Sequence, residues 1–466
     1  MLDATLGFKI GEKLAAYEEE MLLFRLCCQA ASQRLYLFYQ RADESGRMLA
    51  VSPYLGEACR RFGNDEQSVD VVPRRLTDRV LQRPTIKLFL SPAELTQWLA
   101  ISGQDPTDLV LALGRDAETF RHAASALDRI EEEGSTLTLF DGMTGTVESH
   151  WARVIERGLA PTPLERYAHC PFQYFAADVL RLEPSRVPMG QEPDAALIGM
   201  LCHATLRRCY ERLVQAGWPT VPMAGDMVEQ TIRASVEQTS ADLESQHRTG
   251  HYLLWELAKD LIVTLVTAAV KADEMEQAEH PYQPIAFEVD GEGTMPGILS
   301  EGSLKIRGRI DRLDRNRASG ALRVLDYKFK VGLAMKPEDR NLTQSAVRGY
   351  RLQPPLYSCL TVPGQPAPNQ VQFMFLAPQW PTTISRSTFE AMSWSSGTGT
   401  LIQSTIRTLV DGIRAGRFFI LPDGYCDGCG FRMICRREHA PTWWRAHRAT
   451  EPKGLKKLRA QKNADE

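Results

Sequence analysis

The sequence lacks any apolar run long enough to cross a lipid bilayer. Its most apolar stretch, residues 261–270, is about half the length of a membrane-spanning helix. Residues 1–11 also lack the basic start and the apolar run of a secretory signal peptide. No internal repeat and no low-complexity segment is present. These absences predict a globular cytoplasmic protein that has no contact with a membrane.

The chain also lacks a large excess of either charge, since its formal net charge is −3 over 466 residues. This value excludes a protein that binds nucleic acid through its whole surface, so any basic surface must be local. A Gly-x4-Gly-Lys-Ser/Thr loop, whose backbone amides would cradle nucleotide phosphates, is missing too. The sequence therefore predicts no ATP hydrolysis by this chain. Its length predicts roughly two to four domains.

Ten cysteines are present, and three of them lie close together: Cys426, Cys429 and Cys435, spaced Cys-x2-Cys-x5-Cys. In a chain this long, clustered thiols indicate a metal centre rather than a disulfide scaffold. Three thiolates leave such a centre one ligand short, and we predict Cys170 as the fourth. Ligation by thiolates alone suits an iron–sulfur cluster or zinc. The alternative is a set of unrelated buried cysteines.

The segment 160–440 combines helical and strand patterns. A mostly helical stretch is expected over residues 195–279. Alternating apolar side chains predict three consecutive strands in an antiparallel meander, then a further strand and a helix: residues 284–290, 303–311, 321–328, 371–376 and 400–414.

Upstream patterns predict a helix over residues 12–33 and strands over residues 34–40 and 135–140. Thr162, followed by Pro163 and by Glu165 three positions later, predicts a helix start with a capping box.

Two acids and a lysine lie on neighbouring predicted strands. Asp326 and Lys328 share one face of residues 321–328, and Asp311 ends the preceding strand, so the two carboxylates meet across the hairpin. Close carboxylates repel each other unless a cation joins them, and oxygen ligands with water left on the metal suit Mg²⁺ or Mn²⁺. A metal-bound water is a nucleophile for phosphodiesters, which Lys328 would position. The alternative is a salt bridge at an exposed strand edge.

Three further side chains gain interest beside these acids. His203 lies on one helical face with residues at three- and four-residue spacing, where a histidine is either a core residue or a ligand. Gln353 and Tyr357 lie one turn apart in Gln-Pro-Pro-Leu-Tyr, which is either a simple helix start or part of a site.

In this order the motifs resemble the nuclease domain of the RecB family, which has the PD-(D/E)XK fold. The shared elements are Gly-x3-His at His203, Gly-Arg-Ile-Asp-Arg at Asp311, Asp-Tyr-Lys at 326–328 and the Gln-x3-Tyr pair. Cys-Pro-Phe-x-Tyr-Phe at Cys170 and the C-terminal cysteines resemble the iron–sulfur nucleases of the AddB type, the partners of AddA-type motors in bacterial helicase–nucleases.

The resemblance implies an α/β fold: a PD-(D/E)XK nuclease core, with a mixed sheet flanked by helices, and a [4Fe–4S] cluster that acts as an iron–sulfur staple between its ends. It also implies that His203, Asp311 and Asp326 bind the metal together with the backbone carbonyl of Tyr327. Lys328 would then assist the attacking water.

The same resemblance gives Gln353 and Tyr357 a role in contacting DNA or supporting the site. The implied function is a metal-dependent DNA exonuclease that acts on single-stranded ends in double-strand break repair and recombination, with an AddA-like helicase as partner. Two alternatives stay open: a free-standing iron–sulfur exonuclease of single-stranded DNA, and a non-catalytic DNA-binding scaffold.

The resemblance extends to the N-terminus. Residues 20–24 and 30–37 are similar to the last motor motif of UvrD-type helicases, in which Ala30 replaces the arginine that completes an ATP site. The predicted organisation is therefore a remnant of an inactive helicase-like domain, a helical connector, the nuclease domain and a basic tail: residues 1–60, 61–155, 156–440 and 441–466. The tail, with Trp443 and Trp444, either lies along DNA or is a solvated helix.

Overall fold

The computed structural model describes residues 15–40, 48–62, 117–184, 192–299, 302–330, 337–378, 382 and 384–462. The chain divides into two compact units, Met1–Arg121 and His122–Glu466. Much of the predicted connector, residues 63–116, lies outside the described residues, as do residues 1–11. No helix in the described part of the chain is both long enough and apolar enough to cross a membrane.

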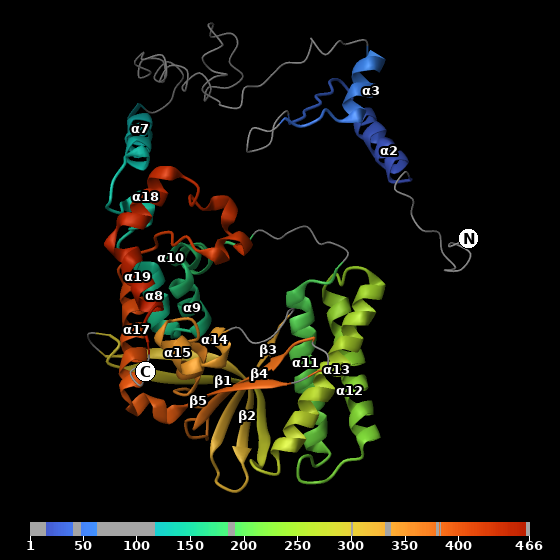
Figure 1. Cartoon of the computed structure of the whole chain (residues 1–466), viewed down its shortest axis with the longest axis vertical. Coiled ribbons are helices and arrows are strands. Elements are labelled where there is room, and N and C mark those ends of the chain that lie inside the picture. The colour runs from blue at the N-terminus through green and yellow to red at the C-terminus, as the bar shows by residue number, and fades with distance from the viewer. Residues whose placement is uncertain are drawn as a thin grey trace. The chain divides into compact units, whose positions relative to one another are not determined.

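The first unit contains the helices α2 (Ala15–Gln29) and α3 (Pro53–Phe62), which Figure 1 labels. α2 confirms the core of the helix predicted over residues 12–33. The strand predicted over residues 34–40 is wrong, because these residues take no regular secondary structure. Tyr36 and Phe38 are 66% and 86% exposed, so the apolar alternation of this segment corresponds to no buried face.

The second unit is built on one mixed sheet of five strands in the order β1-β2-β3-β4-β5. The strands are β1 (Tyr282–Pro296), β2 (Ser303–Asn316), β3 (Leu322–Phe329), β4 (Gln370–Leu376) and β5 (Ser385–Glu390). β1, β2 and β3 form the predicted antiparallel meander, whereas β3 and β4 are parallel. The parallel pair requires a crossover, which contains α14 (Pro337–Arg340), α15 (Leu342–Val347) and α16 (Gln353–Tyr357). The predicted α/β class is confirmed.

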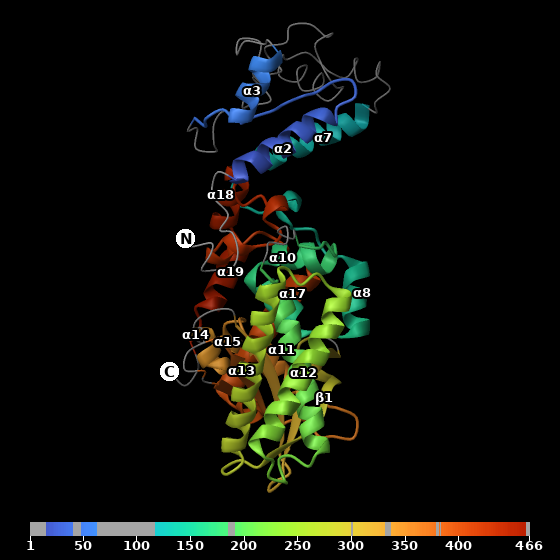
Figure 2. The same cartoon turned by 90° about the vertical axis from the view of Figure 1, so that its right-hand side faces the viewer.

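Helices cover both faces of this sheet. α11 (Ala195–Gln215), α12 (Gly225–Gln246) and α13 (Tyr252–Glu276) lie side by side over one face, as Figure 2 shows. Along β3, Leu325 and Tyr327 pack in the cluster beneath these helices. Leu322 and Val324 pack in a second cluster on the other face, together with α9 (Pro161–His169) and α17 (Gly397–Arg414). Burial on both faces makes β3 the rigid centre from which the acidic residues project.

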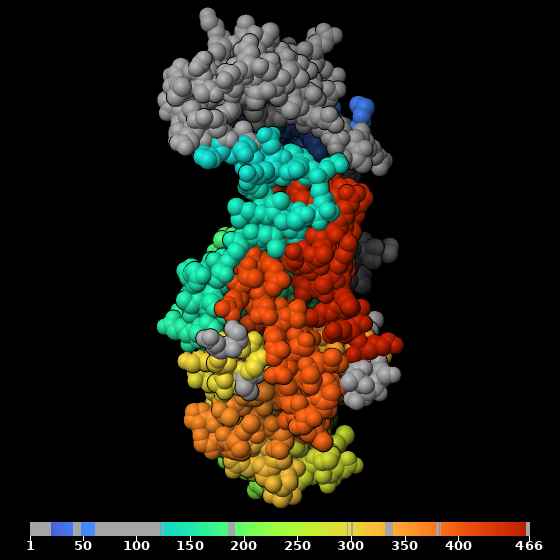
Figure 3. All heavy atoms as spheres, turned by 90° about the vertical axis from the view of Figure 1, so that its left-hand side faces the viewer, coloured from blue at the N-terminus to red at the C-terminus, as the bar shows by residue number. Residues whose placement is uncertain are grey.

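The two ends of the second unit pack together. The segment before the sheet contains α7 (Ala117–Glu131), which begins in the first unit, the short η3 (Leu139–Asp141), α8 (Glu148–Arg157), α10 (Pro171–Tyr174) and η4 (Phe175–Val179). The segment after β5 contains η5 (Ala391–Ser395), α17, η6 (Gly424–Gly428), η7 (Arg432–Ile434), α18 (Ala440–Arg448) and α19 (Thr450–Arg459). In Figure 3 the red C-terminal atoms lie directly against the turquoise atoms of the earlier segment.

A buried ion pair explains two differences from the sequence prediction. The Arg445 guanidinium bonds the Asp141 carboxylate with both N···O distances at 2.8 Å, and both side chains are buried. Asp141 also accepts the Thr138 backbone N–H at 2.9 Å, which turns the chain into η3 where a strand over residues 135–140 was predicted. Arg459 is buried as well and donates to Ala168 O at 2.6 Å. These two arginines of the predicted basic tail are therefore part of the folded unit.

Candidate active site

The candidate active site lies where two strands of the sheet separate. β2 and β3 pair over four positions, residues 312–315 with residues 322–325. Asp311 and Asp326 are the next residues beyond this paired stretch, one on each strand. β3 continues to pair with β4 as far as Phe329. We call the opening between β2 and β3 the fork, and both predicted acids stand at its start.

A local irregularity aims a third carboxylate at the fork. The register pairs Phe287 with Arg312 and Val289 with Ile310, so Glu288 lies opposite Asp311. Glu288 has a φ of 49°, a left-handed conformation that side chains other than glycine rarely adopt. Such a residue in a strand pair behaves like a bulge, because it turns the side chains that follow toward the other face.

The buried side chains of β2 show this change of face. Ile306 and Ile310, at even positions, pack in the same cluster as Leu313, at an odd position, while Arg312 points to the opposite face. The switch occurs at Asp311. A strand of strict alternation would have kept Asp311 among exposed arginines, whereas here it turns into the fork.

Three side chains form a compact group of potential metal ligands. Ligand atoms of His203, Glu288 and Asp311 all lie within 4.8 Å of one another. His203 Nδ1 is 3.3 Å from Asp311 Oδ2, which also accepts the backbone N–H of Tyr327 at 2.9 Å. Burial opposes protonation of His203, but the hydrogen bond and charge of Asp311 prevail and raise its pKa. The structure thus brings together His203, Asp311 and Tyr327, and it adds Glu288, which the sequence analysis missed.

Asp326 lies at the buried side of the fork. Its Oδ1 accepts a hydrogen bond from the Gln353 side-chain amide, and its Oδ2 is 2.7 Å from Lys328 Nζ in an ion pair without hydrogen-bond geometry. Burial raises the pKa of this carboxyl to about 6, although the Lys328 charge lowers it, and nearby Asp311 raises it further. A buried acid that shares its surroundings with a second acid is best stabilised as an anion by an additional cation.

Lys328 is held in place by its neighbours. Its Nζ donates to Gln353 Oε1 at 2.6 Å and lies 4.4 Å from the centre of the Phe373 ring. Gln353 is positioned in turn by Glu165, whose carboxylate accepts the backbone N–H groups of Leu352 at 2.7 Å and Gln353 at 2.9 Å. The predicted capping box is therefore wrong: α9 begins at Pro161 with Ala160 as N-cap, and Glu165 binds the start of α16.

Tyr357 supports the site from the side of β2. Its hydroxyl donates to Arg309 O at 2.8 Å, next to the strand position of Asp311. Its ring packs against Gly308, where a Cβ atom would come within 2.4 Å of Tyr357 Cε1. Glycine at this position is what allows the close approach. Gln353 thus enters the acidic site directly, and Tyr357 holds the strand that carries Asp311.

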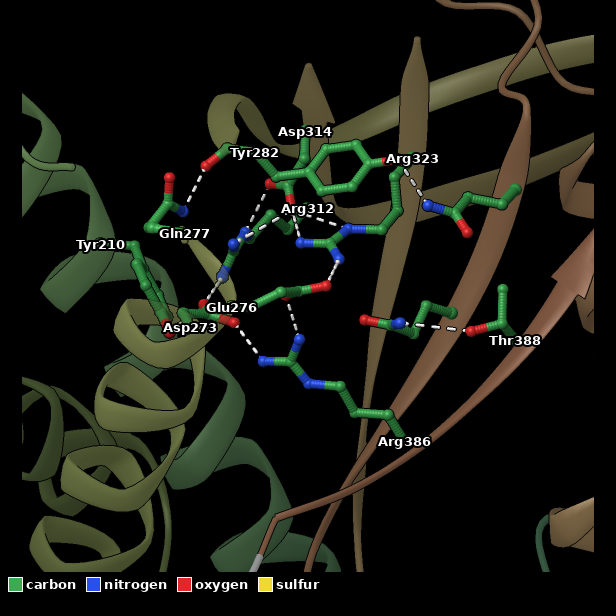
Figure 4. A network of polar contacts seen from close by, with 12 residues as sticks. Tyr210, Asp273, Glu276, Gln277, Tyr282, Arg312, Asp314, Arg323, Arg386 and Thr388 are labelled. Atoms are coloured by element: carbon green, nitrogen blue, oxygen red, sulfur yellow. Dashed lines mark hydrogen bonds and ion pairs between the residues drawn. The ribbon is translucent and has the colours of Figure 1, made fainter. Parts of the chain in front are cut away.

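A buried ion network fixes the opposite face of the same strands (Figure 4). The Arg312 guanidinium binds Asp273 of α13 at 2.6 Å and Asp314 at 2.6 and 3.0 Å, and it donates to the Tyr327 hydroxyl at 3.3 Å. The other charged members are Arg323, Arg386 and Glu276, joined by further ion pairs. This network holds α13 against the sheet and anchors Tyr327, which lies between Asp326 and Lys328 in sequence.

The four predicted cysteine ligands share one neighbourhood. Burial raises the pKa of the Cys435 thiol to about 11, and the charges of Cys170, Cys426 and Cys429 raise it further. Backbone N–H groups point at these sulfurs: Phe172, Gln173 and Leu421 at Cys170, and Asp423 at Cys426 with a distance of 3.4 Å. Amide hydrogen bonds to sulfur favour thiolates, the form that binds metal. The spacing of these residues in sequence therefore predicted a real cluster of thiols.

The distances between these thiols are wider than one small metal ion requires. Within the described ranges, the three-residue group at the fork is the one set of His, Cys, Asp and Glu ligand atoms that closes to 4.8 Å, and the cysteine sulfurs form no such set. Four thiolates on one zinc ion would lie about 3.8 Å apart, given Zn–S bonds of about 2.3 Å in a tetrahedron.

The fold and the fork together define a class, namely an α/β protein with the acidic site of a nuclease. Residues 158–436 match the model of the PD-(D/E)XK nuclease superfamily, and the chain belongs to that superfamily. This assignment confirms the resemblance drawn from the motifs.

Curated relatives are named as one of the subunits of an ATP-dependent helicase/deoxyribonuclease. The relative from Desulforudis audaxviator is 27% identical over 344 residues, which cover 70% of this chain and 29% of the relative. The one from Geobacillus thermodenitrificans is 23% identical over 339 residues, covering 68% and 28%, and the one from Anoxybacillus flavithermus is 31% identical over 175 residues, covering 36% and 15%. The chain thus spans less than a third of the length of these relatives.

Proposed function

We propose that this chain is a metal-dependent deoxyribonuclease that degrades DNA from its ends, as the nuclease component of an ATP-dependent helicase–nuclease that processes double-strand breaks. The observation that carries the proposal is the fork, where Asp311, Asp326 and Lys328 converge with His203. The names of the relatives support both the substrate and the assembly. Because the chain has no phosphate-cradling loop, ATP hydrolysis would belong to an AddA-like partner.

The residues of the fork fit a hard divalent cation, Mg²⁺ or Mn²⁺. His203, Glu288 and Asp311 offer ligand atoms within 4.8 Å of one another, and Asp326 Oδ2 is buried without a hydrogen bond. The backbone carbonyl of Tyr327 is the remaining candidate ligand. A bound ion would supply charge that stabilises the phosphate and acidity that activates a water. Lys328 would hold that water, or the developing negative charge, beside Asp326, while Gln353 fixes both side chains.

A nuclease assay with matched metal conditions tests this function. We expect degradation of end-labelled linear single-stranded DNA in Mg²⁺ or Mn²⁺, none in EDTA, and none of a circular single strand, because the proposed enzyme requires an end. The Asp326→Asn variant, prepared identically, excludes a contaminating nuclease. DNA binding without cleavage in either metal would contradict the proposal and favour the non-catalytic scaffold.

For the four cysteines we propose a [4Fe–4S] cluster rather than zinc. The wide spacing of the thiols and the backbone N–H groups directed at them support a ligand larger than one ion. Such a cluster would join Cys170, before the sheet, to residues 426–435, after it. Its role would be structural, since binding free energy at such a site is also folding free energy.

Anaerobic purification should give a brown protein with broad absorption at roughly 400 nm, as expected for cysteine-ligated iron–sulfur clusters. The Cys429→Ser variant should lose iron and sulfide and become more sensitive to proteolysis between its two joined segments. Cys359→Ser is the matched control, because Cys359 lies on a different part of the unit and bonds Pro355 O. A colourless wild-type protein with stoichiometric zinc would overturn the cluster.

A further inference from the structure

A small basic pocket opens beside β2, on the side that leads away from the fork. It has a volume of about 140 Å³. Arginines from three separate segments line it: Arg153 and Arg157 of α8, Arg181 after η4, and Arg307 of β2. We call these four residues and the cavity between them the arginine pocket. A cavity of this size suits one phosphate group rather than a nucleobase.

Backbone pairing along the free edge of β2 builds this pocket. β3 leaves that edge beyond residue 312, and the segment after α8 replaces it: Leu159 N donates to Lys305 O at 2.9 Å, and Arg307 N donates to Leu159 O at 3.1 Å. Gly158 makes the turn with a φ of 83°, and a Cβ there would press on Lys305. The end of α8 is thereby fixed next to Arg307.

The charges of the arginine pocket are not neutralised within the described part of the chain. Arg157, Arg181 and Arg307 are exposed and have no carboxylate partner there, and Arg153 donates to a backbone carbonyl of its own helix at 3.1 Å. Asp178, the one acid that lines the cavity, is already bound to Arg166 at 2.5 Å. Four guanidinium groups around a cavity with no unpaired carboxylate form a site for an anion.

The position of the pocket relates it to the fork. Arg307 precedes Asp311 by four residues on the same strand, a separation of about 13 Å at roughly 3.3 Å per residue. That length corresponds to about four nucleotides at the ~3.4 Å rise of a stacked strand, and to fewer in an extended one. A DNA strand with one phosphate at the acids therefore reaches the arginine pocket with another.

We propose that the arginine pocket binds a backbone phosphate of the DNA strand, up to four nucleotides from the phosphate held in the fork. This inference rests on the proposed function, since it takes DNA as the substrate. Guanidinium groups bind phosphate oxygens in a two-pronged geometry, and such contacts fix the register of a strand without reading its sequence. The pocket would then set which phosphodiester reaches Asp311 and Asp326.

The test measures binding of a fluorescein-labelled oligodeoxythymidylate to the full chain in EDTA, where no cleavage is expected, across a range of salt concentrations. Arg157→Ala and Arg307→Ala should each weaken binding several-fold and reduce the slope of log affinity against log salt by about 0.7, the contribution of one phosphate contact on a single strand. Arg248→Ala, an exposed arginine in the connection between α12 and α13, is the control and should leave the slope unchanged.

Oligonucleotides with a single uncharged methylphosphonate, placed in turn at each of the first four positions from the cleaved bond, locate the contact. At one position the substitution should weaken binding by the wild type but not by Arg307→Ala. Equal slopes for the wild type and the Arg157→Ala/Arg307→Ala double variant would overturn the inference. Cleavage with unchanged slopes sinks the pocket alone, whereas altered slopes without cleavage in Mg²⁺ or Mn²⁺ sink the catalytic proposal alone.

Discussion

Replacing Lys328 with alanine should reduce kcat for DNA cleavage by about 10²–10³-fold, the usual loss when one donor to a developing negative charge is removed. Nζ of Lys328 lies 2.7 Å from Asp326 Oδ2 and 2.6 Å from Gln353 Oε1, so alanine removes the cation that faces the acids from β3. DNA affinity should stay within a few-fold, since one exposed contact among many is lost. Single-turnover cleavage of end-labelled DNA separates the two quantities.

The pH of this measurement matters because Lys328 also acts on Asp326. Burial raises the Asp326 pKa to about 6 while the Lys328 charge lowers it, so the alanine variant has a higher Asp326 pKa than the wild type. Assays at pH 8 to 9 keep this carboxyl ionised in both proteins, and the remaining difference then reports the missing ammonium.

Lys330→Ala provides a matched control for this variant. Lys330 follows two residues later, pairs with Asp339 at 3.3 Å and lies over the Phe375 ring instead of Phe373. It loses the same charge from the same stretch of chain, yet it makes no contact with the carboxylates of the fork. If Lys328→Ala cleaves DNA at the same rate as Lys330→Ala, the catalytic role of Lys328 is wrong.

Local patterns in the sequence were sufficient for the strands and for the spacing of Asp326 and Lys328. Alternation of apolar side chains placed the antiparallel meander, and two residues of separation placed the acid and the lysine on one face. These features depend on a period of two within one strand, which needs no knowledge of the partner strand. The family assignment followed from the same motifs in the same order.

What the sequence could not reveal depends on pairing between strands. Glu288 enters the site because a left-handed residue reverses the face of β1, and nothing in its neighbours announces that conformation. Glu165 has the spacing of a local cap, but its carboxylate binds the start of α16, which is 187 residues away. The fork itself exists because β2 and β3 stop pairing after four positions, a property of the assembled sheet.

Buried charge is the other feature that composition concealed. Arg312 and Asp314 belong to a run of charged residues in β2 that resembles a solvent-exposed edge, yet both side chains are fully buried. Their burial becomes favourable only when Asp273, Arg323 and the rest of the network arrive from other elements. An exposed run and a buried network look the same in one strand.

Replacing Arg312 with methionine should lower the free energy of unfolding by about 3–5 kcal/mol, because the change leaves buried carboxylates short of one cation. The network contains three guanidinium groups and three carboxylates, so one substitution leaves it with an unbalanced negative charge (Figure 4). Asp273 and Asp314 are the acids directly affected. Urea unfolding at pH 7, followed by circular dichroism, measures the change.

Arg309→Met is the control on the same strand. Arg309 is 60% exposed and pairs with Glu288 at 2.7 Å, and an exposed pair of this kind contributes at most about 1 kcal/mol. The double variant Arg312→Met/Asp273→Asn restores the balance of charge and should recover part of the lost stability, since Tyr210 still finds an acceptor at residue 273. Equal losses from Arg312→Met and Arg309→Met would show that the network does not hold α13 on the sheet.

Acid should distinguish the variants further. Burial alone would raise the pKa of Asp273, but the charges of Arg312 and Arg386 prevail and hold it below its ordinary value. A group whose pKa is depressed by folding stabilises the native state above its unfolded pKa of about 3.9, and this stability is lost as the pH falls through the folded pKa. Without Arg312 the folded pKa of Asp273 rises, so the pH at which acid unfolds the protein should also rise. Because Tyr327 loses its Arg312 contact in the same variant, cleavage measured under conditions that keep the protein folded should fall as well, which links this buried face of β3 to the acids on the other.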